Sequence, residues 1–279
     1  MTVSPPSTLR DPAQAPGAGT WTGRTVRARI SARTLRRDRW WVQPAITVAV
    51  LVAFIVYSTW AAFVNGNYTW EPYISPFYSP CIASICKSSS STWEIVGTWW
   101  PISPAILILI FPLGFRLTCY YYRKAYYRAF WLSPPACAVA EPHKRYSGET
   151  RFPLILQNVH RYFLYFAVIF NIILTYDAVV AFRDHTGAWG HMGLGTLVLV
   201  ANALLLWGYT LGCHSCRHLC GGKVNRFSKH PWRFKAWKFL NRFNQHHMQW
   251  AWASLIVVGL SDLYVRLVAS GVIHDPRFF

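Results

Sequence analysis

Long apolar runs separated by polar segments fill the chain after residue 41. A helix that crosses about 30 Å of hydrocarbon needs roughly 20 residues, and five of the runs are that long. We expect membrane spans at residues 42–64, about 93–117, about 158–182, 192–213 and about 246–268. Pro101, Pro104 and Pro112 fall in the second run and predict kinks there. The pattern predicts an all-α membrane protein, built as a bundle of five transmembrane helices.

The segment before the first span has no apolar core. Residues 1–41 are rich in Pro, Ala, Gly and Arg, and they contain no pattern of a cleavable signal peptide. We expect this segment to be a basic, flexible cytoplasmic tail, and we expect residues 42–279 to form one transmembrane anchor domain.

The composition supports a membrane protein. The chain is 53% hydrophobic and 17% aromatic, with a formal net charge of +18 and a mean hydropathy of +0.20. Apolar spans that alternate with basic loops explain this combination, which an ordinary soluble domain does not show. The aromatic content also excludes a disordered chain. Because basic residues hold loops on the cytoplasmic side of a membrane, the charge does not indicate a nucleic-acid partner.

Basic residues are unequally distributed among the connecting segments. The tail carries eight Arg, residues 116–151 carry seven Lys and Arg, and residues 217–242 carry eight. The segment between the first two spans has only Lys87. Since cytoplasmic loops are enriched in Lys and Arg, we expect the N-terminus and the second and fourth connections in the cytoplasm, and the C-terminus outside.

Potential metal ligands gather at the predicted cytoplasmic ends of the spans. The second span closes at Thr118-Cys119-Tyr120, and the fourth runs into a stretch with five thiol or imidazole groups in eight residues. Thiolate and imidazole ligands together suit zinc or iron–sulfur chemistry. The candidate metal ligands are Cys213, Cys216, Cys220, His160, His214, His218, His246 and His247.

Helical geometry predicts which of these candidates share one face of a helix. If the fourth helix continues through residues 213–220, Cys213, Cys216 and Cys220 share one stripe of it. In the same helix, His214 and His218 form a second stripe. The two adjacent histidines that open the fifth span point about 100° apart, so we expect only one of them to face the bundle. The alternative for the whole stretch is a polar, thiol-rich helix end that faces lipid headgroups.

Residues 224–243 interleave Lys and Arg with Trp and Phe. This pattern predicts an interfacial helix, whose aromatic side chains enter the headgroup layer while its cations meet anionic lipid or the acidic face of a soluble partner.

Two further features lie on the predicted outer side. Cys81 and Cys86 share an outer loop, where an oxidising compartment favours a disulfide over a metal site. Asp177 and Asp262 lie near the outer ends of the third and fifth spans. The alternatives for them are a proton relay, pairing with Arg266 or Arg183, and simple solvation at the membrane interface.

A five-span chain with an inside N-terminus and with Cys and His at its cytoplasmic mouth resembles the membrane anchor (C) subunit of succinate dehydrogenase. It is most similar to the mycobacterial and actinobacterial type, whose anchor holds a Rieske-type cluster in place of haem. The resemblance rests on the topology and on the stretches around His160, residues 213–220 and His246. It implies a multi-pass protein of the bacterial cytoplasmic membrane, in contact with membrane lipid.

The resemblance also implies partners and a role. A flavoprotein subunit would oxidise succinate, an iron–sulfur subunit would deliver the electrons, and this chain would dock both and pass electrons through a Rieske-type 2Fe-2S cluster to menaquinone. A higher oligomer of the complex is compatible with this role. Cys213, Cys216, His246 and His160 are the leading cluster ligands implied. The implied quinone pocket has the candidates His160, Arg161, Tyr162 and Trp232.

Three other functions compete with this interpretation. The first is an anchor with haem b, in which His160 and a second histidine are the axial ligands. The two-haem, five-helix anchors draw such histidines from the first four helices, whereas the first two spans here contain none. The second is a transporter, and the third is a membrane scaffold stabilised by zinc.

Overall fold

A computed structural model describes residues 38–83, 92–96, 102–139, 142 and 154–279. The predicted tail, residues 1–41, lies almost entirely outside these residues. The helices are α1 (Val42–Val64), α2 (Ala105–Leu117), α3 (Tyr120–Ala129), α4 (His160–Val180), α5 (Leu194–Leu211), α6 (His214–Gly221), α7 (Pro231–Gln245) and α8 (His247–Ala269). The strands are β1 (Thr69–Trp70), β2 (Tyr73–Ile74), β3 (Cys81–Ala83) and β4 (Thr92–Val96). Short 3-10 helices, η3 (Leu154–Val159) and η4 (Phe227–Lys229), precede α4 and α7.

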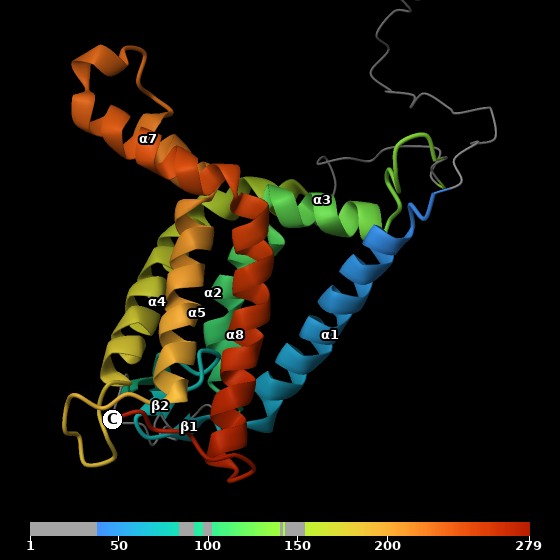
Figure 1. The fold of residues 1–279 in the computed structure, drawn as a ribbon. Coiled ribbons are helices and arrows are strands. Elements are labelled where there is room, and N and C mark those ends of the chain that lie inside the picture. The colour runs from blue at the N-terminus through green and yellow to red at the C-terminus, as the bar shows by residue number, and fades with distance from the viewer. Residues whose placement is uncertain (1–37, 84–91, 97–101, 140–141, 143–153) are drawn as a thin grey trace, which may run out of the picture.

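Apolar helices form the bundle (Figure 1). Four of them, α1, α4 with η3, α5 and α8, are long and apolar enough to cross a membrane, and the bent pair of α2 and α3 adds a fifth if it counts as one span. The bounds of α1, α4, α5 and α8 agree with the predicted spans to within two residues. The predicted fold class, an all-α membrane protein, is confirmed. The small sheets are two-stranded: β1 pairs with β2 antiparallel, and β3 with β4 parallel.

The second predicted span is the one that the structure corrects. Residues 92–96 form strand β4, and the helix begins only at Ala105, directly after Pro104. At about 1.5 Å per residue, its 13 residues reach roughly 20 Å, which is less than the thickness of a hydrocarbon core. The chain then bends by 78° at Thr118 and Cys119 and continues as α3. The predicted span over about 93–117 was therefore wrong at its start, where residues 92–96 form a strand.

The two ends of the bundle differ in character. At one end lie α3, α6 and α7, and we call this the basic end; at the other lie β1, β2 and the C-terminus (Figure 1). The ends of helices that the sequence placed on one side of the membrane lie together, since α1, α4 and α8 begin at the basic end while α2 and α5 finish there. Which of the two ends faces the cytoplasm stays a prediction.

The basic, aromatic segment 224–243 folds largely as α7, which packs on α6 and projects beyond the bundle (Figure 1). Its faces are unlike each other: Trp232 is 78% exposed, whereas Leu240 is buried. Arg233 donates hydrogen bonds to the carbonyls of Cys220 and Leu219, which ties α7 to the end of α6. The predicted helix is confirmed, and its contact with lipid or with a partner stays a prediction.

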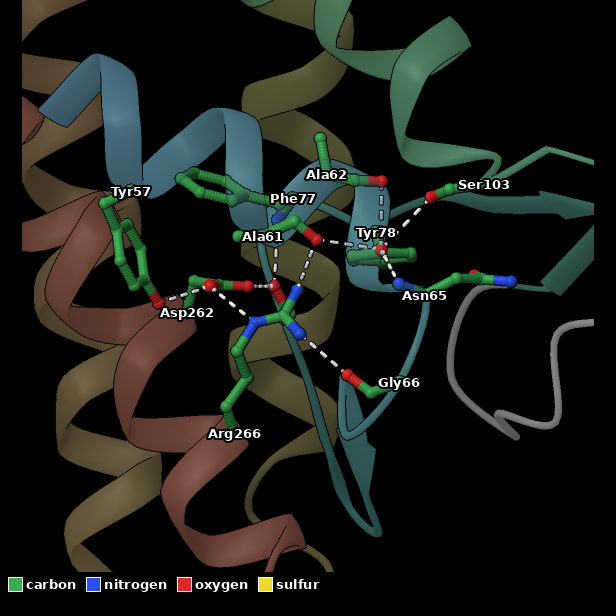
Figure 2. A network of polar contacts seen from close by, with 11 residues as sticks. Tyr57, Ala61, Ala62, Asn65, Gly66, Phe77, Tyr78, Ser103, Asp262 and Arg266 are labelled. Carbon is green, nitrogen blue, oxygen red and sulfur yellow. Dashed lines mark hydrogen bonds and ion pairs between the residues drawn. The ribbon is translucent and has the colours of Figure 1, made fainter.

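A buried ion pair fixes α8 to α1 at the end opposite the basic end. The Nε atom of Arg266 lies 2.8 Å from the Oδ2 atom of Asp262, and both side chains are buried. The Tyr57 hydroxyl, on α1, donates to the same carboxylate at 2.5 Å, and the Ser75 hydroxyl donates to its other oxygen. Figure 2 shows how Tyr57 and Arg266 converge on Asp262. Of the alternatives left open for Asp262, the structure shows the pairing with Arg266.

The guanidinium of Arg266 also satisfies backbone carbonyls. Nη1 donates to the Gly66 carbonyl at 2.7 Å, and Nη2 donates to the Ala61 carbonyl at 2.8 Å (Figure 2). These carbonyls belong to the last turn of α1 and to the loop that follows, where no further helical N–H is available to them. One side chain of α8 therefore supplies hydrogen-bond donors to the carbonyls at the end of α1.

Close packing of α5 against α8 depends on Gly208. A Cβ atom at this position would lie 2.5 Å from the Trp250 ring, well inside van der Waals contact. We expect Gly208→Ala to lower the free energy of unfolding by about 1–3 kcal/mol, the usual cost of overpacking. Leu204→Ala is the matched control, because Leu204 lies on the same helix but is 66% exposed. Thermal unfolding in detergent measures both, and equal midpoints would contradict the proposed tight contact.

Candidate metal centre

Four cysteine and histidine side chains converge at the basic end, each from the start of a different helix. Cys119 and Cys213 are the N-cap residues of α3 and α6, and both have extended backbone. His160 and His247 are the first residues of α4 and α8. Because a helix N-terminus carries a partial positive charge, it favours a thiolate placed there.

The interruption of the helix between α5 and α6 brings Cys213 into this group. Helix α5 ends at Leu211, Gly212 follows as its C-cap, and Cys213 turns to an extended conformation with ψ 137° before α6 begins. The fourth helix therefore does not continue through residues 213–220. The stripe predicted to hold Cys213, Cys216 and Cys220 on one helix was wrong, because Cys213 precedes α6 and points into the bundle.

The first contact joins His160 and Cys213, with the His160 Nε2 atom 3.0 Å from the Cys213 Sγ atom. The Thr118 hydroxyl lies 3.0 Å from His160 Nδ1, and it donates its one proton to the Gly114 carbonyl at 2.7 Å. Toward His160 this hydroxyl can only accept, so Nδ1 carries the proton and Nε2 presents a lone pair to the thiol. A lone pair held in this way is what a metal requires from histidine.

The second contact joins His247 and Cys119, with His247 Nε2 3.5 Å from Cys119 Sγ. The other ring nitrogen, Nδ1, is buried and has no hydrogen-bond partner among the described residues. Both imidazoles lie flat against an aromatic ring: Phe115 stacks on His160 at 4.6 Å between centroids, and Tyr209 stacks on His247 at 5.1 Å. These rings fix the orientation of the imidazoles.

The site is dry. Cys119, Cys213 and His160 are each less than 5% exposed, and His247 is half-buried. Burial, and after it the nearby Cys119 thiol, raises the pKa of the Cys213 thiol to about 12. At neutral pH this thiol is therefore protonated and a poor nucleophile. A bound metal would displace the proton.

The two contacts belong to one site. Cys119 interacts electrostatically with Cys213, and His160 with His247, so all four groups are neighbours. Within the part of the chain that the structure describes, no three such groups already stand in metal-binding geometry. The side chains meet as two Cys–His contacts, and a metal between them would have to separate the partners of each contact.

The other predicted ligands surround this group: Cys216 packs against the same core cluster as Cys119 and Cys213, and His214 interacts electrostatically with His247. Cys216 and Cys220 are half-buried on α6, and His214 and His218 are exposed on the same helix. His246 is exposed, and its Nδ1 lies 3.3 Å from the Arg242 carbonyl. Among the described residues, no hydrogen bond joins these side chains to the four that converge. Of the adjacent pair of histidines, His247 faces the bundle, as expected for one of the two.

The predicted quinone candidates are not gathered in one place. His160 is buried in the candidate metal centre, whereas Arg161 and Tyr162 are exposed on the outside of α4. Trp232 is exposed on α7, where Lys235 lies 4.7 Å from its ring.

On the opposite end, Cys81 is disulfide-bonded, which confirms that the outer-loop thiol is oxidised. Cys86, its predicted partner, lies outside the described residues.

The fold and the site together define a class: a multi-pass helical membrane protein with buried thiols and imidazoles at one end of its bundle. Residues 42–271 match the family described as actinobacterial succinate dehydrogenase subunit SdhC. The chain also resembles a chain of the solved Mycobacterium smegmatis Sdh1 complex in the apo form, with 50% identity and a TM-score of 0.81, over 91% of this chain and 96% of that one. None of the curated proteins compared with the chain matches it. The chain belongs to the actinobacterial SdhC family, the membrane subunits of succinate dehydrogenase, and it is a multi-pass protein of the bacterial inner membrane.

Proposed function

We propose that the chain anchors succinate dehydrogenase in the membrane and transfers electrons to menaquinone, with Cys119, Cys213, His160 and His247 as the ligands of a Rieske-type 2Fe-2S cluster. The observation that carries the proposal is the convergence of two buried thiols and two oriented imidazoles. A Rieske-type centre takes two Cys on one iron and two His on the other, which is this donor set. Relative to the sequence, Cys119 enters the ligand set, and Cys216 and His246 leave it.

The chain's own residues give the proposed site its properties. Thr118 holds His160 in the tautomer that presents Nε2, and Phe115 and Tyr209 hold the two rings while excluding water. When bound, a 2Fe-2S cluster would accept and release one electron at a time. Imidazole ligands in place of two thiolates raise its reduction potential above that of an all-cysteine cluster, which suits the last carrier before a quinone.

The partners would dock at the basic end. Oxidation of succinate to fumarate releases two electrons and two protons, and reduction of menaquinone to the quinol consumes two of each. A flavoprotein subunit would carry out the oxidation, and an iron–sulfur subunit would pass the electrons on. The exposed cations of α7 and its flanking loop, which include Lys235 and Arg242, offer a surface for an acidic partner or for anionic lipid.

A zinc site is the second candidate for the same residues, because Cys₂His₂ is also a common structural zinc donor set. A haem b is less well supported, since each buried histidine is in contact with a thiol and the first two spans contain no histidine.

The test is the metal content of the complex purified with its partner subunits. We expect iron and acid-labile sulfide beyond what the partners carry, and an electron paramagnetic resonance signal with the low average g value of a Rieske-type centre. If the complex contains zinc and shows no such signal, the site is a structural zinc site and not a cluster. Sharp alpha bands in the reduced optical spectrum would favour haem, and either result would overturn the proposed cluster.

A further inference from the structure

Arg116 places a positive charge beside the candidate metal centre. It lies in the last turn of α2, and its side chain reaches across the bundle to α8. The guanidinium carbon lies 4.8 Å from the centroid of the Tyr209 ring, and the same ring stacks on the His247 imidazole. Arg116 and this candidate ligand therefore contact one shared aromatic ring, and the charge of Arg116 acts electrostatically on His247.

Hydrogen bonds hold the guanidinium of Arg116 without neutralising it. Nη1 donates to the Tyr122 hydroxyl at 2.8 Å and to the Ala251 carbonyl at 3.3 Å. Nη2 donates to the Ser254 hydroxyl at 3.1 Å. All three acceptors are uncharged. Among the described residues, no carboxylate forms an ion pair with Arg116, whereas Arg266 at the opposite end of the bundle has such a partner.

A cation without a carboxylate partner is costly within a membrane bundle, and such residues usually have a function. Arg116 is half-buried, and the helix that carries it is otherwise uncharged. A negative charge that forms nearby would offset this cost.

The candidate metal centre would carry such a charge in one redox state only. In an oxidised 2Fe-2S centre, the two ferric ions and two sulfides have two net positive charges, which the thiolates of Cys119 and Cys213 would cancel. The neutral imidazoles add no charge. Reduction adds one electron and leaves one net negative charge. A fixed cation close by favours the reduced state, because net charge and surroundings set the potential of such clusters.

We propose that Arg116 is the counter-charge of the reduced cluster and raises its reduction potential. Arg116 is not a ligand in this assignment, since it acts through space on the centre. The inference rests on the proposed cluster. At an effective dielectric constant of about 20, a unit charge roughly 10 Å away changes a one-electron equilibrium by about tenfold. A tenfold change corresponds to about 59 mV.

Arg116→Gln tests the inference, because it removes the charge and keeps a hydrogen-bond donor. We expect the ratio of reduced to oxidised cluster at a fixed ambient potential to fall by about tenfold. A redox titration of the resonance signal in the purified complex measures this ratio. Arg116→Lys keeps the charge, and we expect it to restore the potential.

Ser254 offers a matched pair of variants that leave Arg116 in place. Ser254→Asp puts a carboxylate beside Nη2 and neutralises the guanidinium, so the potential should fall as it does in Arg116→Gln. Ser254→Ala removes the hydrogen bond and leaves the charge, so the potential should stay unchanged. This pair decides the question if Arg116→Gln fails to fold.

Unchanged potentials in the folded variants Arg116→Gln and Ser254→Asp would overturn the inference. An equal fall in Ser254→Ala would also overturn it, because the effect would then come from hydrogen bonding and not from charge. Both outcomes leave the cluster signal in place and concern Arg116 alone. Absence of the resonance signal from the unaltered complex would remove the proposed cluster, and the role of Arg116 with it.

Discussion

Replacing Cys213 by serine is expected to remove the Rieske-type resonance signal. The iron content of the complex should fall by the two iron atoms of a 2Fe-2S cluster. Cys213 is 1% exposed, and its Sγ atom lies 3.0 Å from His160 Nε2 at the centre of the candidate site. Serine has nearly the same size, and therefore the fold should survive the change. Metal analysis and resonance spectroscopy on the purified complex measure the effect.

Matched neighbours make this prediction sharp. Cys216→Ser changes a thiol three residues away on α6, and His246→Ala changes the exposed neighbour of His247. Both variants should keep the signal, whereas His247→Ala should lose it. If Cys216→Ser lost the signal and Cys213→Ser kept it, the ligand set would follow the helical stripe of the sequence, and the structural assignment would be wrong.

Removing the charge of Arg266 is expected to destabilise the protein strongly. Arg266→Met leaves the fully buried carboxylate of Asp262 without its cation, and breaking one side of a buried ion pair costs about 3–5 kcal/mol. The Gly66 and Ala61 carbonyls lose a donor as well. Thermal unfolding in detergent, followed by circular dichroism, measures the loss.

A double variant identifies the cause. Asp262→Leu combined with Arg266→Met removes both charges, and we expect it to recover a substantial part of the stability that the single variant loses. No recovery would contradict the unpaired carboxylate as the main cause. It would then assign the loss to the backbone carbonyls that Arg266 satisfies at the end of α1.

The spans were predictable wherever hydrophobicity alone decides the structure. Residues 42–64 contain no charge, and α1 has these bounds. The second span failed because apolar content does not distinguish a strand from a helix: Trp93, Ile95 and Val96 are aromatic or β-branched and favour a strand. Pro104 then marks where a helix can begin, since proline fits the start of a helix without the loss of a hydrogen bond.

Part of the metal centre was predictable and part was not. His160, Cys213 and His247 were among the candidates because they lie where spans begin or end. Cys119 was placed at the same end but not selected, since a lone cysteine after a span carries little weight. The signal was the shared position of Cys119 and Cys213, each directly after the last residues of a span. The break at Gly212, which decides between Cys213 and Cys216, depends on tertiary packing that helical periodicity does not contain.

The four residues of the candidate metal centre lie far apart in the sequence, so they are synthesised at different times. His160 and Cys213 are 53 residues apart, and Cys119 and His247 are 128 apart. His247 opens the last helix of the chain, so the fourth donor arrives only when α8 leaves the ribosome and enters the bilayer. Metal delivered during translation would meet an incomplete set of donors. If these four groups hold a metal, a truncation before α8 would yield a subunit that lacks the fourth donor.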